Sequence, residues 1–206
     1  MTAITHAVFE FKLATWRKPI EQLDNWREVI ELLLGAGAPQ DLLTAIAVGR
    51  TAAVREILNE NPALARSADR WEDLPLNWAV NLDQPEIVEI LLAAGAKIDA
   101  VGDYMDAPPL HRAARLRRGA IAKILIEHQA DINQIDGRGQ VPLHQAAYNF
   151  KPQLVRLLLE AGAKKDAEDR NGQTPREYAQ SGYHARPLTE AEALDRAETI
   201  RLLSEP

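Results

Sequence analysis

The sequence contains no cysteine, and this absence excludes several kinds of chemistry at once. Disulfide frameworks, thiol nucleophiles, cysteine-ligated zinc and iron–sulfur clusters all need a residue that the chain does not have. Long hydrophobic runs are absent too, because no stretch approaches the ~18 uncharged apolar residues of a membrane-spanning helix. The segment from Met1 to Pro19 has no basic region followed by an apolar one, as a secretory signal would. We therefore expect a cytoplasmic protein without a membrane segment.

The chain also lacks the short motifs that bind phosphate groups or carry a serine nucleophile. No segment has the form GxGxxG, GxxxxGK or GxSxG. The formal net charge is −6, which repels a phosphate backbone, so we expect no nucleic-acid partner. With 46% hydrophobic and 26% charged residues, the chain has the composition of a globular protein that buries a core.

A segment that starts with proline recurs four times along the chain. The four copies are Pro75–Ala79, Pro109–Ala113, Pro142–Ala146 and Pro175–Ala179. Their prolines are 34, 33 and 33 residues apart, and a fixed period of this length indicates an array of structural repeats. Each of the first three copies is followed by an apolar run with i, i+3, i+4 spacing, which predicts a helix with one buried face. These runs are Ile87–Leu92, Ile121–Ile126 and Leu154–Leu159.

The ends of these second helices carry matching residue types. Pro85 and Pro152 fit the first helical turn, where the missing N–H costs nothing. Gly95 and Gly162 fit the left-handed position just beyond the last turn. Gln129 replaces the glycine in the third repeat, so we expect its helix end to be weaker by roughly 1 kcal/mol.

The repeated Pro-Leu-His-x-Ala core on a period of 33 resembles the ankyrin repeat, and the resemblance runs from about Gln40 to the C-terminus. We therefore expect an all-α fold, an ankyrin-repeat solenoid of stacked helix-turn-helix units with short β-turn fingers. The resemblance implies that the short Pro-Leu-His helices face the concave side of the stack. It places the fingers near Asp69–Asp73, Asp103–Ala107, Asp136–Gln140 and Asp169–Gln173.

The first part of the chain departs from this pattern. A degenerate repeat lacks the proline and the histidine but keeps apolar residues such as Leu42 and Leu58 in register. Only eight positions separate Leu34 from Leu42, so no finger fits between them. We expect an atypical helical cap there, with helices near Ala3–Thr15 and Asn25–Leu34.

The last repeat also departs from the pattern, because about eleven residues are inserted between its two helices. Thr189 and Glu192 have the spacing of a capping box, which predicts that the final helix starts there. A stack needs caps at both ends to cover its apolar faces. The predicted organisation is an N-terminal cap at 1–38 and a repeat stack at 39–206, with repeats at 39–68, 69–102, 103–135, 136–168 and 169–206.

His111 and His144 are the residues most suited to acid–base or metal chemistry. The resemblance implies a different role, in which this histidine hydrogen-bonds the backbone of the neighbouring loop. A third metal ligand is not evident, and Asn77 and Glu177 occupy the same position in other repeats, which favours a polar tether. We expect no catalytic residue, no metal site and no cofactor.

Four arginines fall within seven residues of the third repeat: Arg112, Arg115, Arg117 and Arg118. Mapped onto the repeat, Arg112 and Arg115 point into the concave groove, while the other two lie at the turn between helices. Two interpretations remain open. The arginines either bind a partner or are solubilising surface charges, some of them paired with acidic side chains of adjacent repeats.

Aromatic residues make up only 5% of the chain, yet they recur along the predicted groove beside these arginines. Tryptophan, tyrosine, methionine and arginine are enriched in the cores of protein interfaces. We therefore predict a protein-interaction module that binds a partner protein or peptide of acidic character and that is itself a monomer. An inhibitor or immunity-type protein would be one specific form of such a module, which the sequence permits but does not show. The predicted partner-binding residues are Trp71, Trp78, Leu82, Tyr104, Met105, Arg112, Arg115, Arg138, Tyr148 and Phe150.

Two alternatives to partner binding stay open. An enzyme or small-ligand protein would use the groove as a pocket, with His111, His144, Tyr104 and Asp103 in it. A regularised or self-assembling repeat array would have no single native partner, although the irregular caps and the degenerate first repeat argue against a consensus design.

Overall fold

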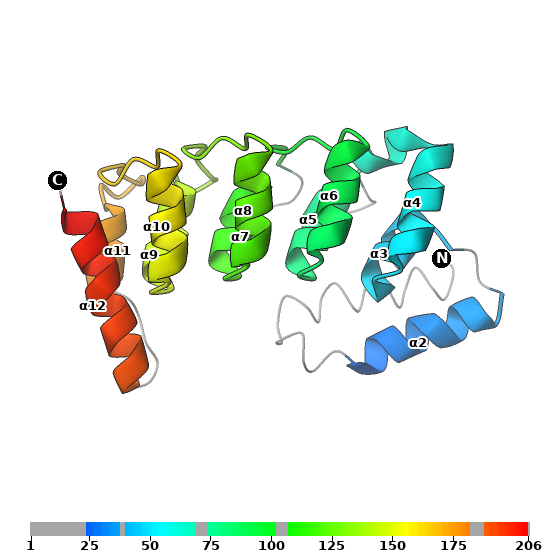
Figure 1. Ribbon diagram of the computed structural model, residues 1–206, viewed down its shortest axis with the longest axis horizontal. Helices are drawn as coiled ribbons and strands as arrows, with labels where there is room; N and C mark the ends of the chain where they lie inside the picture. The colour runs from blue at the N-terminus through cyan, green and yellow to red at the C-terminus, as the bar shows by residue number, and fades with distance from the viewer. Residues whose placement is uncertain (1–23, 38–39, 69–73, 102–106, 182–187, 206) are drawn as a thin grey trace. The chain divides into compact units, whose positions relative to one another are not determined.

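The computed structural model describes residues 24–37, 40–68, 74–101, 107–181 and 188–205 (Figure 1). Within these ranges the chain forms helices and no strands, so the predicted all-α fold is confirmed. Helix α2 (Asp24–Gly35) comes first, and the 3-10 helix η2 (Pro62–Arg66) follows α4. The remaining helices form five consecutive pairs: α3 (Leu42–Val48) with α4 (Thr51–Glu60), α5 (Pro75–Asn81) with α6 (Pro85–Ala93), α7 (Pro109–Arg115) with α8 (Gly119–Glu127), α9 (Pro142–Tyr148) with α10 (Pro152–Glu160), and α11 (Pro175–Ser181) with α12 (Glu190–Ser204).

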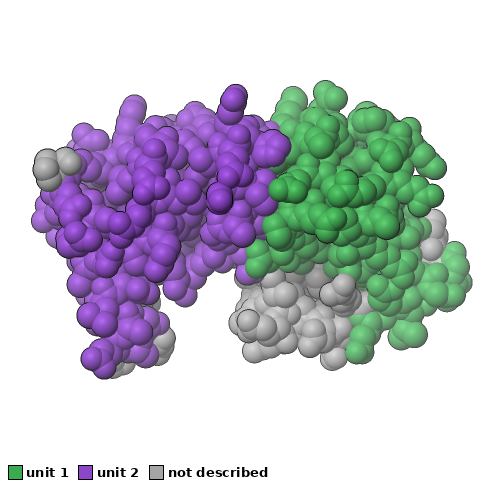
Figure 2. All heavy atoms as spheres, in the orientation of Figure 1, with its two compact units in different colours: residues 1–97 green, residues 98–206 purple. Residues whose placement is uncertain are grey.

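The chain divides into two compact units, residues 1–97 and 98–206 (Figure 2). In the first unit, α3 packs against α5, and α4 packs against α6. In the second unit, α9 packs between α7 and α11, and α10 packs between α8 and α12. Each unit therefore has two layers, one made of the first helices of the pairs and one made of the second.

The prolines that define the repeat begin the short first helices, as predicted. Pro75, Pro109 and Pro142 occupy the first helical turn, where no intrahelical bond needs their N–H. The leucine that follows each of these prolines is buried in the core. The proline thus fixes where the helix starts, and the leucine anchors that start in the core.

The predicted left-handed residues close the second helices. The backbone φ is 89° at Gly95 and 94° at Gly162, and Gln129 adopts the same conformation with φ of 66°. A side chain in this conformation crowds the following carbonyl, which glycine avoids. The end of α8 is therefore strained at Gln129, as the sequence predicted.

Both ends of the chain follow the sequence predictions where they are described. Helix α2 matches the predicted helix at Asn25–Leu34, whereas the predicted helix at Ala3–Thr15 lies outside the described residues. At the start of α12, Thr189 Oγ1 accepts a hydrogen bond from Glu192 N at 3.3 Å, and Glu192 Oε2 accepts one from Thr189 N at 2.9 Å. This reciprocal pair is the predicted capping box. The boundaries of the cap and the repeats remain predictions.

We predict that Gln129→Gly stabilises the protein by about 1 kcal/mol, because glycine adopts positive φ without the steric penalty of a side chain. The free energy of unfolding in urea checks this. The matched control is Gln153→Gly, which changes an exposed glutamine in the first turn of α10, where the backbone φ is negative, so glycine should not raise the same free energy. A loss of stability in both variants would contradict the assignment of strain to Gln129.

Candidate interaction surface

Two of the predicted fingers are tight turns organised by an aspartate. At Asp136–Gln140, the Asp136 N–H donates to Gln140 O at 2.9 Å, and Asp136 Oδ1 accepts from Arg138 N at 2.8 Å and Gln140 N at 2.9 Å. Asp169–Gln173 repeats this pattern with the backbone N–H groups of Asn171 and Gln173. The finger predicted at Asp69–Asp73, and Asp103–Ala107 apart from Ala107, lie outside the described residues.

The two histidines tether these turns to the helices before them. His111 Nε2 donates to Gln140 O at 2.7 Å, and His144 Nε2 donates to Gln173 O at 3.0 Å. Val141 N–H donates to His144 Nδ1 at 3.1 Å, so this ring is neutral with its proton on Nε2. Both rings are buried and bind backbone carbonyls, which confirms the predicted tethering role.

His111 differs from His144 in one bond. The residue equivalent to Val141 is Pro108, which has no N–H to donate. The Nδ1 atom of His111 is buried, and no residue in the described part of the chain hydrogen-bonds it. Burial lowers the pKa of His111, against the opposing effect of the hydrogen bond to Gln140 O and the charge of Asp136, so the ring is neutral at pH 7.

Glu177 takes the histidine position in the last repeat, where it bonds Thr174 just before its own helix α11 and not the backbone of a neighbouring finger. Its Oε2 accepts from Thr174 N at 2.7 Å and from Thr174 Oγ1 at 2.9 Å. The Thr174 N–H and hydroxyl thereby lower the pKa of the Glu177 carboxyl. Across the described ranges, no group of three or more His, Asp or Glu side chains could hold a metal ion.

The assignment of Arg112 to a partner-binding groove needs correction, because the structure buries its side chain completely. Its Nε donates to Ala107 O at 3.0 Å, which ties α7 to the backbone just before it. Trp78 and Phe150 are corrected for the same reason, since each is only 3% exposed. These three side chains belong to the core and cannot be contacted by a partner in this conformation.

The other predicted residues within the described ranges reach the surface. Tyr148 is 37% exposed, Arg138 is exposed, and Arg115 is partly exposed. Leu82 is partly exposed in the first unit. Trp71, Tyr104 and Met105 lie outside the described residues.

Arg115 and Arg138 line one small pocket of the second unit. Its volume is about 60 Å³, and its other lining residues are Ala107, His111, Asp136 and Gln145. Arg115 comes from the last turn of α7, whereas Arg138 comes from the finger that precedes α9. The tether from His111 to Gln140 O holds that finger against α7, so it also brings the two arginines to one pocket.

A polar network beside this pocket was not predicted. Tyr178 OH donates to Asp169 Oδ2 at 2.8 Å and accepts from Gln140 Nε2 at 2.6 Å, while Gln140 Oε1 accepts from Gln145 Nε2. The Tyr178 ring lies edge-on to His144, with centroids 5.0 Å apart, and to Tyr148, with centroids 6.4 Å apart. The network fixes the surface on which Tyr148 is exposed.

The network separates the pKa values of its two acids. Burial acts to raise the pKa of Asp169, but hydrogen bonds from Gln173 N–H, Tyr178 OH and Asn171 N–H outweigh it and lower that pKa. Burial, together with the hydrogen bond to the Asp169 carboxylate, raises the pKa of Tyr178 to about 12.

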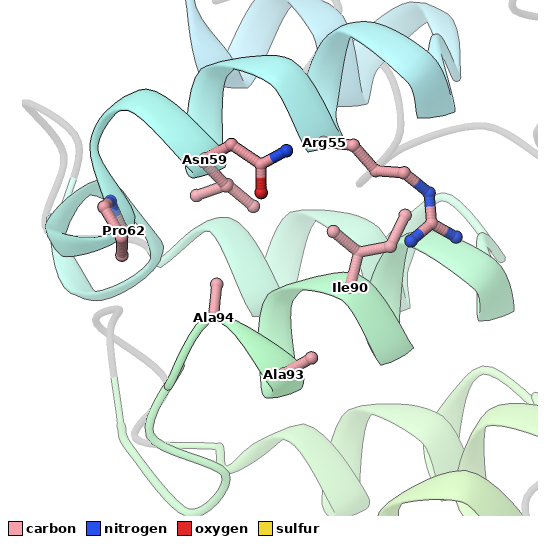
Figure 3. A pocket seen from close by; sticks show the side chains of 7 residues that line it. Arg55, Asn59, Pro62, Ile90, Ala93 and Ala94 are labelled. Atoms are coloured by element: carbon pink, nitrogen blue, oxygen red, sulfur yellow. The ribbon is translucent and has the colours of Figure 1, made fainter.

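A second pocket, of about 400 Å³, lies in the first unit, where α4 and η2 face α6 (Figure 3). Leu58, Pro62, Ile90, Ala93 and Ala94 contribute apolar side chains to its lining, and Arg55 and Asn59 of α4 contribute polar groups. Arg55 forms an ion pair with Glu86 at 3.3 Å, and both side chains are exposed. None of the predicted site residues lines this pocket.

Comparison with known proteins identifies the class to which this two-layer array belongs. The family model of ankyrin repeats (3 copies) matches residues 42–136 and 110–203, so the chain belongs to the ankyrin-repeat family. The predicted resemblance is confirmed.

Among curated proteins, the chain is similar to palmitoyltransferase ZDHHC13 of several mammals. The mouse protein is 35% identical over 74 residues, which are 36% of this chain and 12% of that protein. The human and Pongo abelii proteins are 27% identical over 119 residues, which are 58% of this chain and 19% of each relative. The chain thus aligns with less than a fifth of the length of these relatives. In the part of the chain that the structure describes, no helix is both long and apolar enough to span a membrane.

We predict that Arg112 and Arg115 respond differently to substitution by alanine. Arg112→Ala should lower the free energy of unfolding by about 2–4 kcal/mol, because it leaves a cavity and removes a buried hydrogen bond. Arg115→Ala should cost about 1 kcal/mol or less, since the side chain is partly exposed. Urea denaturation of both variants checks this, and equal losses would contradict the burial difference.

We predict that a pH titration, in which ultraviolet absorbance follows tyrosine ionisation, finds one tyrosine with a pKa of about 12. This ionisation step should be missing in Tyr178→Phe. Asp169→Asn should move this pKa toward the ordinary value of about 10, because the carboxylate acceptor is lost. Because folding raises this pKa, the stability it contributes is present below about pH 10 and lost as pH rises toward 12. If the free energy of unfolding of wild type and of Tyr178→Phe differed by the same amount at every pH in this range, the predicted effect of the network on Tyr178 would be wrong.

Proposed function

We propose that the chain is a non-catalytic interaction module that binds a partner protein or peptide of acidic character. The carrying observation is that Arg115, Arg138 and Tyr148 are all accessible on neighbouring elements of the second unit, held by tethers and a hydrogen-bond network. A surface fixed in advance binds with less loss of conformational entropy than one ordered during binding. Leu82, Trp71, Tyr104 and Met105 remain predicted contacts.

The chemistry of the surface supports an acidic partner. Arg138 forms no ion pair with any described residue, although the whole chain carries a net charge of −6. Arginine donates two parallel hydrogen bonds to a carboxylate, which makes it suited to recognising acidic side chains. Tyr148 adds an amphipathic ring of the type enriched at interface centres.

Two observations favour this proposal over an enzyme or a small-ligand site. At the predicted groove, the pocket lined by His111, Arg115 and Arg138 has about 60 Å³, several times less than the 300–1,000 Å³ typical of ligand pockets, and the larger pocket of about 400 Å³ contains none of the residues predicted for an enzyme site. The two histidines are occupied as tethers, because each donates its Nε2 proton to a backbone carbonyl. The similarity to a palmitoyltransferase covers at most 19% of that protein, so we propose the shared ankyrin repeats, and not transferase activity, as the common property.

Affinity capture from lysate of the native organism tests the proposal. The double variant Arg115→Ala, Tyr148→Ala should lose a partner that the wild type retains, because truncating two interface-centre residues costs at least about 2 kcal/mol of binding. Circular dichroism establishes that the variant keeps its fold.

The matched control changes exposed residues on the second helices, Lys123→Ala in α8 with Gln153→Ala in α10. This control should retain the partner. If the control loses the partner and the Arg115, Tyr148 variant keeps it, binding takes place on another face and the proposed surface is wrong.

A further inference from the structure

We propose that the pocket between α7 and the Asp136–Gln140 finger binds one side-chain carboxylate, from an aspartate or glutamate of the partner. This inference rests on the proposed function and deepens it, because it names the group that the surface recognises. It further places an apolar or aromatic residue of the partner beside that carboxylate, over Tyr148.

The charges that line the pocket favour a single anion. Arg115 and Arg138 each contribute one positive charge, Asp136 contributes one negative charge, and His111 is neutral. The formal charge of these lining side chains is +1, which favours an anionic ligand over a cationic one.

The Asp136 carboxylate does not fill the role of that anion, because it already organises its own turn. Its Oδ1 accepts the backbone N–H groups of Arg138 and Gln140. The Arg138 guanidinium has no hydrogen-bond or ion-pair partner within the described ranges, although its backbone carbonyl accepts from Arg170 N at 3.2 Å. A guanidinium placed in this way can take a carboxylate with both of its parallel donors.

The size of the pocket selects the ligand group. About 60 Å³ is room for a few water molecules, a size that suits a carboxylate group better than a large aromatic side chain. A carboxylate on a flexible side chain can enter while the partner backbone stays outside. Tyr148 lies one helical turn beyond the pocket residue Gln145 and provides an exposed ring for the neighbouring partner residue.

The test titrates three blocked peptides into the ¹⁵N-labelled full chain at constant ionic strength. The probes are acetyl-Ala-Glu-Ala-amide, its neutral match acetyl-Ala-Gln-Ala-amide, and acetyl-Ala-Ala-Ala with a free C-terminal carboxylate. The backbone amide signals of Gly139 and Gln140 report on the finger. We expect the glutamate peptide to bind at least ten-fold more tightly than the glutamine peptide and more tightly than the free-carboxylate peptide.

Variants locate the binding site. Arg115→Gln and Arg138→Gln should each weaken the glutamate peptide about ten-fold, whereas Arg170→Gln should leave its affinity within two-fold. Arg170 is the control because it is an exposed arginine of the next finger and does not line the pocket. Equal binding of the glutamate and glutamine peptides, preference for the free C-terminus, or an equal loss in Arg170→Gln would overturn the proposal.

The outcome is separable from that of the proposed function, because the titration uses no native partner. If the glutamate peptide shows no preferential binding while partner capture still requires Arg115 and Tyr148, the proposed interaction surface is supported and only the carboxylate site is wrong. If the peptides bind as expected while capture does not depend on these residues, the pocket stands and the partner binds elsewhere.

Discussion

The hydrogen bond from a buried histidine to the backbone of the next finger is the interaction on which the second unit depends. His111 joins α7 to Gln140, and His144 joins α9 to Gln173, so each first helix is held to the turn that follows its repeat. Both rings are buried, where a lost hydrogen bond leaves a polar group unpaired at a cost of about 1–3 kcal/mol. Because the tether places the finger, it also places Arg138, Gln140 and the surface that they form.

The features that could be predicted from the sequence are those with local causes. Proline at the first turn, glycine beyond the last turn and the Thr189–Glu192 capping box act within a few residues, and all are present in the structure. The strained helix end at Gln129 was also predictable, because it is a single exception in a regular series. The histidine tether was predicted from the family resemblance, since its carbonyl partner lies 29 residues away.

The composition of the surface could be predicted only in part, because burial depends on tertiary packing. Arg112 and Arg115 lie three residues apart on the same side of one short helix, yet one is fully buried and the other lines a pocket. Helical periodicity does not distinguish such positions on a helix with partners on several sides. The bond between Gln140 and Tyr178 spans 38 residues and has no spacing rule that would reveal it. Tyr178 does lie three residues after its proline, as Gln145 does, and this shared position is the available signal.

Proline at position 108 makes the third repeat chemically different from its neighbour. In the fourth repeat the Val141 N–H settles which ring nitrogen carries the proton, so His144 has one fixed tautomer. The His111 ring is restrained at Nε2 alone. Whether the residue before the proline has a backbone N–H therefore decides whether the histidine Nδ1 accepts a hydrogen bond from its own helix start. In a repeat array, each unit interacts mainly with its adjacent units, so such a difference stays confined to one repeat. A change of the residue before the proline can therefore alter one histidine while the packing of the other repeats stays the same.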